Sequence, residues 1–419
     1  MQLYWQNNKN LMRKTIVKKI DEGLRFGLLL LFVIQLTGCA NMPDIFSLRA
    51  VDSFVADIVE LVAGEDEVEI DEEELADLEQ IDDLTLLWKA SVGESLTALF
   101  SPVADGKSVY AADEDGYLFR FDAETGERVW RIDTEKELSG GVGLGGGLIL
   151  VGSYEGELLA YDEAGNSQWR AQVSSEILSA PQIENDVVVV RTGDGRIFGL
   201  DALDGSRQWV YQGATPSLTV RSYAGALVTH GAVFAGFAGG KLVAMSLYNG
   251  NIGWEVAVSQ PRGVTELERM TDITSLPVVD GQFICAVAYQ GRVACFDMVD
   301  GGQIWVRDAS SNAGLSMDND YLYVSKDNNT VMAYDKRSGA GVWRRGRLAS
   351  LKLSAPLVIG HNLVIANEQG YVTMLRNYDG AIVGRSGTDK SAINANPAPI
   401  PGGFVVQTIE GGLYAFAAE

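Results

Sequence analysis

The sequence is poor in the residues that most enzymes use for acid-base and metal chemistry. Of its 419 residues only two are histidines, His230 and His361, and neither stands near a cysteine or an acidic cluster at the spacing of metal ligands. This removes the usual zinc sites and histidine bases. The G-x-S-x-G, S-x-x-K and H-E-x-x-H patterns are also absent. Most hydrolytic and metal-dependent chemistry is therefore disfavoured.

Positive charge is scarce as well. The chain has 33 Lys and Arg against 56 Asp and Glu, which gives a formal net charge of −23. A protein this acidic offers no electrostatic footprint for a phosphate backbone, so nucleic-acid binding is disfavoured. Hydrophobic residues nevertheless make up 47% of the chain. This content supports a large packed core and argues against disorder.

The N-terminal apolar run is too short to span a bilayer comfortably. Four Lys and Arg lie in residues 14–25, the apolar stretch 26–36 follows, and Leu36-Thr37-Gly38-Cys39 ends it. The charged and apolar parts stand in the order of a secretory signal. The last four residues resemble a bacterial lipobox, which implies cleavage before Cys39 and lipidation of that cysteine, palmitate included. Ala40 stands where an Asp would resemble the inner-membrane retention signal, so the resemblance implies the outer membrane.

An acidic tether is expected at 39–83, after a signal peptide at 1–38. Fifteen Asp and Glu lie between Asp52 and Asp83, with no Lys or Arg among them. Such a run repels itself and cannot pack. A short amphipathic helix near the membrane and an acidic strap for a basic partner are alternative roles. An uncleaved signal anchor and a start at Met12 also stay open.

A repeat dominates the rest of the chain. Its pattern runs from a Gly through an Asp and a second Gly to a Trp, as in 116–130, 156–169 and 195–209. The first residue of each copy stands at 116, 156, 195, 240, 291, 329, 370 and 411, so eight copies recur at intervals of 38 to 51 residues. This is the length of one four-stranded propeller blade with its turns. The short β-rich runs between copies are apolar at consecutive positions, which favours sheets packed on both faces.

The sequence therefore predicts an all-β fold over 84–419, an eight-bladed β-propeller with four-stranded antiparallel blades. The Gly and Asp of each copy are expected to make hairpin turns, and the Trp to wedge against the adjacent blade. Trp88 has no Gly-to-Asp half before it, and the half that begins at Gly411 has no Trp. The N- and C-terminal strands should therefore pair in one blade and close the ring. The longest interval, after Gly240, predicts an inserted loop.

Two kinds of motif look chemical but have a plainer interpretation. Residues 141–146 contain a formal G-x-G-x-x-G, which we interpret as a turn because Leu148 to Val151 predict a strand instead of a helix. Asp113–Gly116 and Asp194-Gly195 resemble calcium loops, yet Asp-Gly is the ordinary hairpin signal. No metal site is expected.

Two cysteines lie close together in the sequence. Cys285 and Cys295 flank an expected hairpin turn at Gln290-Gly291, so their side chains should be near neighbours. They form either a disulfide in an oxidising compartment or two buried free thiols.

The repeated turn, Asp-x-x-[Thr/Asp/Ser]-Gly leading to Trp, resembles the docking motif of quinoprotein alcohol dehydrogenases. Those enzymes bind pyrroloquinoline quinone in an eight-bladed propeller. This chain has no vicinal Cys-Cys pair and no constellation for the quinone and its metal. The resemblance therefore implies the framework only, with no cofactor and no catalytic residue.

Lipobox, acidic tether and eight quinoprotein-like blades together resemble the BamB family, lipoproteins of the machinery that folds β-barrels into the bacterial outer membrane. In that family a Leu-x-Leu-Arg stretch and acidic residues of a second loop meet the POTRA domains of BamA. Leu218, Val220, Arg221 and Asp272 match those positions, with Val for the second Leu and Thr274 in place of a second Asp. Two apolar side chains beside an Arg suit an interface anchor, or alternate as ordinary strand core.

The resemblance implies a non-catalytic scaffold on the periplasmic face of the outer membrane. It would be held by its lipid, bind the BamA POTRA domains and the Bam complex, and assist insertion of barrel proteins. A further hypothesis is that nascent outer-membrane proteins pair with exposed blade edges. The alternatives are a quinone-dependent, dehydrogenase-like protein and a ligand-binding periplasmic propeller unrelated to barrel assembly.

Overall fold

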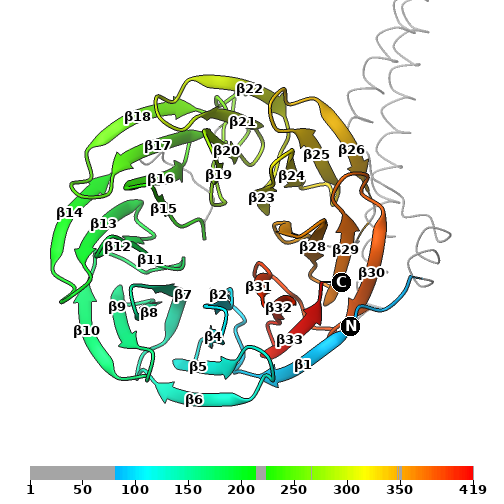
Figure 1. The fold of residues 1–419 in the computed structure, drawn as a ribbon. Coiled ribbons are helices and arrows are strands. Elements are labelled where there is room, and N and C mark those ends of the chain that lie inside the picture. Colours follow the sequence, from blue (N-terminus) through cyan, green and yellow to red (C-terminus); the bar gives the residue numbers. More distant parts are fainter. Residues whose placement is uncertain (1–80, 214–222, 266, 347, 349–351, 419) are drawn as a thin grey trace, which may run out of the picture. The chain divides into compact units, whose positions relative to one another are not determined.

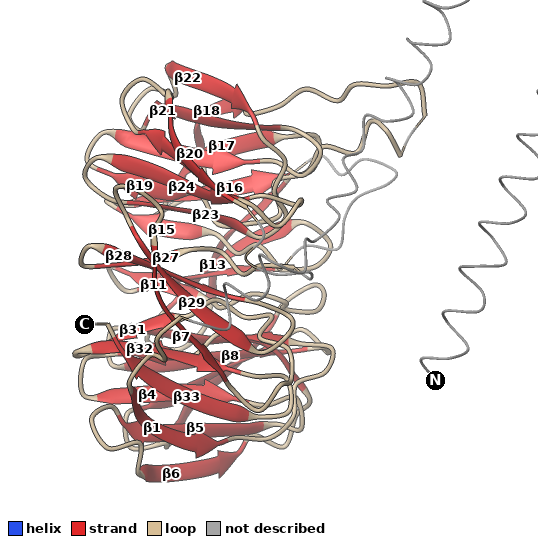
Figure 2. Ribbon diagram, turned by 90° about the vertical axis from the view of Figure 1, so that its right-hand side faces the viewer, coloured by secondary structure: helices blue, strands red, loops and turns tan. Residues whose placement is uncertain are grey.

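The structure is a computed structural model that describes residues 81–213, 223–265, 267–346, 348 and 352–418. Every regular element in these ranges is a β-strand (Figure 2). Within them no helix is long and apolar enough to cross a membrane. The expected signal peptide, Cys39 and the tether up to residue 80 lie outside the described residues.

The strands form eight sheets arranged as the blades of a propeller (Figure 1). Blade 1 holds β3 (Val103–Ala104), β4 (Ser108–Ala112), β5 (Tyr117–Asp122) and β6 (Arg128–Asp133). Blade 2 holds β7 (Leu138–Gly145), β8 (Leu148–Ser153), β9 (Glu157–Asp162) and β10 (Ser167–Gln172), with β2 (Leu99–Phe100) parallel to β7. Blade 3 holds β11 (Gln182–Glu184), β12 (Val187–Arg191), β13 (Arg196–Asp201) and β14 (Arg207–Gln212). Blade 4 holds β15 (Leu227–Thr229), β16 (Ala232–Phe237), β17 (Lys241–Ser246) and β18 (Ile252–Ala257).

The other four blades follow the same plan. Blade 5 holds β19 (Val278–Asp280), β20 (Phe283–Val287), β21 (Arg292–Asp297) and β22 (Gln303–Asp308). Blade 6 holds β23 (Gly314–Met317), β24 (Tyr321–Ser325), β25 (Val331–Asp335) and β26 (Gly341–Arg345). Blade 7 holds β27 (Leu357–Ile359), β28 (Asn362–Ala366), β29 (Tyr371–Arg376) and β30 (Ile382–Gly387). Blade 8 holds β31 (Ala398–Ile400), β32 (Gly403–Gln407), β33 (Gly412–Ala417) and β1 (Leu86–Ser91).

Both ends of the described chain contribute to blade 8. Strand β1 pairs antiparallel with β33, so that Ala90 lies opposite Leu413. The predicted closure of the ring by its N- and C-terminal strands is therefore confirmed, as is the eight-bladed fold. The strands of each blade are given above in their order from the centre of the ring to its rim, so β1 is the outermost strand of blade 8 (Figure 1).

The antiparallel order gives the ring two faces. Turns between the third and fourth strands of a blade, and between the first and second, lie on one face, which we call the turn face. Turns between the second and third strands, and the connections from one blade to the next, lie on the other, which we call the loop face. The described chain enters β1 and leaves β33 at the turn face, where Ala417 N donates to Thr85 O at 2.9 Å.

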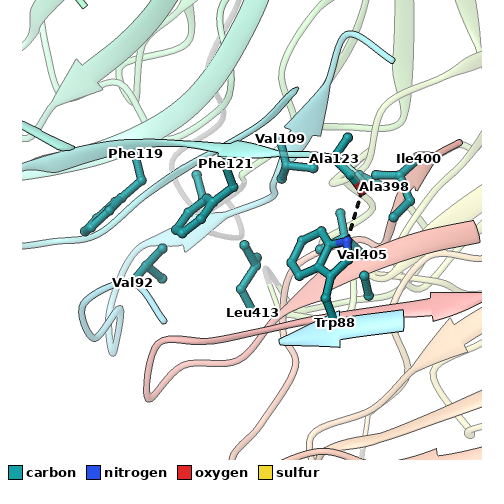
Figure 3. Packing of buried hydrophobic residues seen from close by; sticks show 12 residues of the cluster. Trp88, Val92, Val109, Phe119, Phe121, Ala123, Ala398, Ile400, Val405 and Leu413 are labelled. Atoms are coloured by element: carbon teal, nitrogen blue, oxygen red, sulfur yellow. Dashed lines mark hydrogen bonds between the residues drawn. The ribbon is translucent and has the colours of Figure 1, made fainter. Parts of the chain in front are cut away.

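Seven tryptophans join successive blades as the repeat predicts. Each indole N–H donates to a backbone carbonyl in a turn of the next blade, as Trp88 does to Ala123 O at 2.9 Å (Figure 3). The ring lies on the glycine of that turn, because a Cβ on Gly126 would stand 2.6 Å from the Trp88 ring. Gly126 also has a φ of +71°, which side chains disfavour. The same N–H bond is made by Trp130, Trp169, Trp209, Trp254, Trp305 and Trp343.

The junction between blades 7 and 8 has no tryptophan. Gly384 in β30 occupies the Trp position, and Met374 lies opposite it where most other blades have Ala, Gly or Cys. Leu84 takes up the space, since a Cβ on Gly384 would stand 2.5 Å from Leu84 Cδ2. Leu84 N also donates to Ser386 Oγ at 2.8 Å. Residues 82–85 therefore bridge the seam between β30 and β1.

Replacing Leu84 by alanine should lower the free energy of unfolding by about 2 kcal/mol, because a buried side chain is lost from a seam that has no tryptophan. The midpoint of urea unfolding measures this change. Leu87, which is 44% exposed in β1, supplies the matched control, and Leu87→Ala should shift stability by less than about 0.5 kcal/mol. Equal effects of the two substitutions would show that Leu84 has no special part in closing the ring.

The glycine-rich stretch 141–146 is not the turn that its sequence predicts. It continues β7 as far as Gly145, and the turn into β8 lies at Gly146-Gly147. The glycines are needed because β7 packs closely against blade 3. A Cβ on Gly143 would stand 2.2 Å from Pro181 O, and one on Gly145 would stand 2.2 Å from Ile183 Cγ2. The strand predicted after this stretch, β8, is confirmed.

The structure joins Cys285 and Cys295 in a disulfide. The two residues lie directly opposite each other on β20 and β21. Both are fully buried in a cluster that includes Trp305 and Leu315. Of the two states that the sequence left open, the disulfide is the one present.

Candidate partner-binding surface

The loop face carries the insertion that the longest repeat interval predicts. Residues 258–277 join β18 to β19, and this is the longest connection between blades. Its described residues between 261 and 269 are exposed, whereas 271–273 are buried. The insertion therefore has an exposed tip and a fixed base.

The tip is a single turn closed by its own side chains. Glu268 Oε2 accepts N–H bonds from Val264 at 2.8 Å and from Thr265 at 3.0 Å, and Thr265 Oγ1 accepts one from Glu268 N at 3.2 Å. This reciprocal arrangement is a capping box. The N–H of Thr265 and then that of Val264 hold the pKa of Glu268 below its usual range. Val264 and Leu267 project from the turn, 96% and 62% exposed.

The base is held between blades 4 and 5. Asp272 Oδ1 accepts an N–H bond from Gly239 at 3.0 Å, and its backbone carbonyl accepts one from Tyr289 at 2.8 Å. Ile273 is buried against blade 4, where a Cβ on Gly236 would stand 2.2 Å from its side chain. Asp272 itself is only 4% exposed. The structure thus places this predicted site residue where it positions the loop, with little of its carboxylate available to a partner.

Arg191, at the end of β12, comes from blade 3 to the same region. Its Nη1 donates to Gly236 O at 2.7 Å, and its guanidinium carbon lies 5.0 Å from the centre of the Phe237 ring. Burial lowers the pKa of Arg191 to about 10, and the charge of Asp272 opposes this shift. Arg191 is therefore cationic at neutral pH, with Asp272 as a counter-charge.

The other predicted segment lies between blades 3 and 4 in the sequence. Residues 214–222 lie outside the described residues, and with them Leu218, Val220 and Arg221. The described chain resumes at Tyr223, whose hydroxyl donates to Thr97 O at 3.0 Å. In the sequence, both segments stand between the fourth strand of one blade and the first strand of the next.

Thr274 and the two Asp-Gly motifs have structural positions. Thr274, in place of the expected second Asp, donates its hydroxyl to Asn312 O at 3.4 Å. The motifs Asp113–Gly116 and Asp194-Gly195 lie in hairpin turns, β4 to β5 and β12 to β13, as predicted. In the described parts of the chain no group of three or more His, Cys, Asp or Glu could hold a metal ion.

Sequence reasoning did not single out Val264, Leu267 or Arg191. A signal for the first two was available, because Thr265-x-x-Glu268 is a capping-box pattern and therefore predicts a turn with flanking apolar residues. No local pattern marks Arg191. Its role depends on residues that approach it from the next blade.

Comparison with known proteins supports one family. The family model described as outer membrane protein assembly factor BamB matches residues 71–135 and 114–345. The outer membrane protein assembly factor BamB of Nitrosomonas eutropha is 51% identical over 392 residues, which is 93% of this chain and 94% of that protein. The BamB of Bordetella pertussis is 38% identical and covers 79% of this chain and 86% of its own length.

Solved structures agree with this result. The crystal structure of BamB from Moraxella catarrhalis has a TM-score of 0.74 and 27% identity, and the match covers 80% of this chain and 99% of that one. The quinohemoprotein alcohol dehydrogenase of Comamonas testosteroni reaches a TM-score of 0.65 at 14% identity, over 80% of this chain and 76% of that one, and shares the fold alone. The chain therefore belongs to the BamB family of outer membrane protein assembly factors.

Proposed function

We propose that this protein is a non-catalytic scaffold that binds the POTRA domains of BamA through its loop face and assists insertion of barrel proteins. It acts at the periplasmic face of the outer membrane, held by lipid on Cys39. The corresponding layout is a signal peptide at 1–38, a tether at 39–83 and a propeller at 84–419. The names of its relatives support the assembly role.

One observation carries the proposal, the capped and exposed tip of the 258–277 insertion on a buried base. Two apolar side chains, Val264 and Leu267, stand clear of the ring on a turn that is already ordered. Binding through such a turn avoids part of the entropy cost of ordering a loop, and apolar anchors supply most of the affinity of small interfaces. We assign Leu218 and Val220 further apolar contacts.

The polar residues of the proposed site have separate roles. Arg221 supplies directional hydrogen bonds to carbonyls or carboxylates of the partner. Asp272 holds the base of the insertion, as its bond to Gly239 N supports.

The substitution of both tip residues, Val264→Asp with Leu267→Asp, is expected to weaken binding of the purified BamA periplasmic region by about tenfold or more, because two apolar anchors are lost. Isothermal titration with the mature protein measures the change. The matched control is Val299→Asp, which alters a residue that is 80% exposed in a turn of the turn face. The control should bind like the parent protein. If the double variant and the control weakened BamA binding equally, or if neither weakened it, the loop face would not be the interface.

A second role is pairing of nascent outer-membrane strands with the outer blade edges. One observation favours it: Arg385 N in the outer strand β30 donates to Asp82 O at 3.0 Å, so an outer edge here bonds to a chain segment beside it. Proline at outward-facing amides of β14 and β22 should reduce barrel assembly in cells while BamA binding persists. Barrel assembly at the parental rate, with BamA still bound, would contradict this role.

A further inference from the structure

Three successive blades expose a large apolar side chain at the same position of the turn face. Leu203, Tyr248 and Val299 are the second residues after the third strands of blades 3, 4 and 5 (Figure 1), and they are 87%, 60% and 80% exposed. We call these three residues the apolar arc. Single exposed apolar residues are ordinary on protein surfaces, whereas gathered ones mark binding sites. The repeat of one position in neighbouring blades therefore sets the arc apart from scattered surface residues.

The equivalent turns of the other blades do not extend the arc. Glu124, Ala164 and Arg337 occupy this position in blades 1, 2 and 6. Blade 7 carries Tyr378, but the guanidinium carbon of Arg376 lies 5.0 Å from the centre of its ring, and blade 6 separates it from the arc. The apolar patch is therefore confined to blades 3 to 5, on the side of the ring where the end marked C lies (Figure 2).

The turns of the arc are held from below by the tryptophans of the preceding blades. In each turn the carbonyl just before the arc residue accepts an indole N–H: Trp169 donates to Ala202 O at 2.8 Å, Trp209 to Leu247 O at 2.8 Å and Trp254 to Met298 O at 3.1 Å. Leu203 N donates to Asp201 Oδ1 at 2.9 Å, and Val299 N donates to Asp297 Oδ1 at 2.8 Å. The turns are therefore ordered before any partner arrives, which lowers the entropy cost of binding.

Negative charge surrounds the arc. The turns of blades 3 to 5 on this face, with the strand ends that flank them, are 184–187, 201–206, 229–232, 246–251, 280–283 and 297–302. They contain no Lys or Arg and seven acidic residues, Glu184, Asp186, Asp201, Asp204, Asp280, Asp297 and Asp300. Asp280 is paired with Lys336 of blade 6, and Arg207, the first residue of β14, is the nearest cation along the chain. Carboxylates around an apolar patch favour cationic partners and repel anionic lipid headgroups.

We propose that the turn face of blades 3 to 5 binds a segment of a second protein that carries both apolar and basic side chains. Its apolar side chains pack on the arc, and its Lys or Arg side chains meet carboxylates such as those of Asp204 and Asp300, which follow Leu203 and Val299 directly. Stacked sheets lie about 10 Å apart, so each arc residue contacts a different side chain of the segment. The turn face is opposite the proposed BamA surface, so both partners can bind at once.

A helical peptide of Lys and Leu, with its Leu residues along one face, is the probe for this site. Isothermal titration into the full mature protein measures its affinity. Replacing all three arc residues by serine should weaken binding by about tenfold or more, because the apolar contacts are lost. The matched control is the triple substitution Val129→Ser, Val342→Ser and Val383→Ser, at residues 55%, 42% and 41% exposed in the outer strands β6, β26 and β30. The control should bind within about twofold of the parent protein.

Asp204→Asn with Asp300→Asn tests the part played by charge. Asp204 Oδ1 accepts the Ser206 N–H at 2.8 Å, and Asp300 Oδ1 accepts the Gly302 N–H at 2.8 Å. Asparagine keeps these acceptors, so the turns persist while two negative charges are lost. We expect peptide binding about threefold weaker than that of the parent protein at low salt, and equal binding at high salt. Equal binding at low salt would contradict the basic character of the partner.

Other results would overturn the proposal. It fails if the peptide does not bind the parent protein, or if the serine variant and the control lose the same affinity. Self-association of the parent protein that the serine variant loses would assign the arc to a second copy of this chain instead. Binding of phosphatidylglycerol vesicles through the arc would assign it to a lipid surface. The BamA periplasmic region should bind the serine variant as tightly as the parent protein, and weaker binding would contradict separate faces for the two partners.

Discussion

Replacing Trp209 by alanine is expected to lower the free energy of unfolding by about 3 to 5 kcal/mol, which is the usual range for a buried Trp. Trp209 is 8% exposed, and its indole N–H donates to Leu247 O in the next blade at 2.8 Å. Its ring also covers Gly250, where a Cβ would stand 2.6 Å from the ring. The substitution therefore opens a cavity between blades and leaves a buried carbonyl without its donor. A urea titration monitored by circular dichroism, instead of tryptophan fluorescence, measures the loss of unfolding free energy.

Two other substitutions separate the causes. Trp209→Phe keeps much of the ring but removes the donor, and should cost about 1 to 2 kcal/mol beyond the loss of volume. Val210→Ala changes the next residue of β14, which is 47% exposed, and should cost less than about 0.5 kcal/mol. If Trp209→Ala were as mild as Val210→Ala, the tryptophans could not be the wedges that join the blades.

Replacing Asp272 by alanine should weaken binding to BamA by about 30-fold, equivalent to about 2 kcal/mol. The substitution removes the acceptor for Gly239 N and the charge that faces Arg191. The insertion then loses part of its base, and the partner must order the tip on binding. Titration of the BamA periplasmic region into the purified variant measures this effect.

Asp272→Asn distinguishes support of the loop from direct contact with the partner. Asparagine keeps a carbonyl oxygen for Gly239 N, and Asp272 is 4% exposed, so we expect binding within about threefold of the parent protein. A loss as large as that of the alanine variant would mean that the carboxylate charge, facing Arg191 or the partner, matters more than the acceptor for Gly239 N. Binding at the parental level by the alanine variant would remove Asp272 from the site.

The repeat predicted the fold in detail because the same contacts recur. In the copies that have a second Gly, that Gly lies under a Trp ring of the preceding blade, as Gly126 does under Trp88, so the spacing of the pattern follows from the contact between blades. The displaced Trp88 and the half-repeat at Gly411 likewise predicted the pairing of β1 with β33. The fold was therefore readable from residues whose partners are set by the repeat.

Features outside the repeat were less predictable. The glycines of 141–146 suggested a turn, because their true cause, the approach of Pro181 and Ile183 from the next blade, is not local. The role of Leu84 could not be predicted from its own sequence context. It depends on Gly384, which is distant in the sequence and leaves the space that Leu84 fills. The pairing of Cys285 with Cys295 depended on register, which a hairpin signal alone does not specify.

The candidate site shows the same division. Family resemblance pointed to Asp272 and to the inserted loop, and the structure adds that Asp272 lies under the loop and that Val264 and Leu267 form its exposed tip. Arg191 could not be found from sequence because its partners, Gly236 and Phe237, lie in another blade.

Affinity co-purification of the full-length protein from detergent-solubilised membranes, beside an Arg221→Glu variant, is the most direct test of the scaffold role. Bound proteins are identified by mass, and circular dichroism confirms that the variant is folded. We expect a POTRA-containing barrel protein to be retained by the parent protein and lost from the variant. Recovery of no such protein with the parent under gentle conditions would contradict the scaffold role.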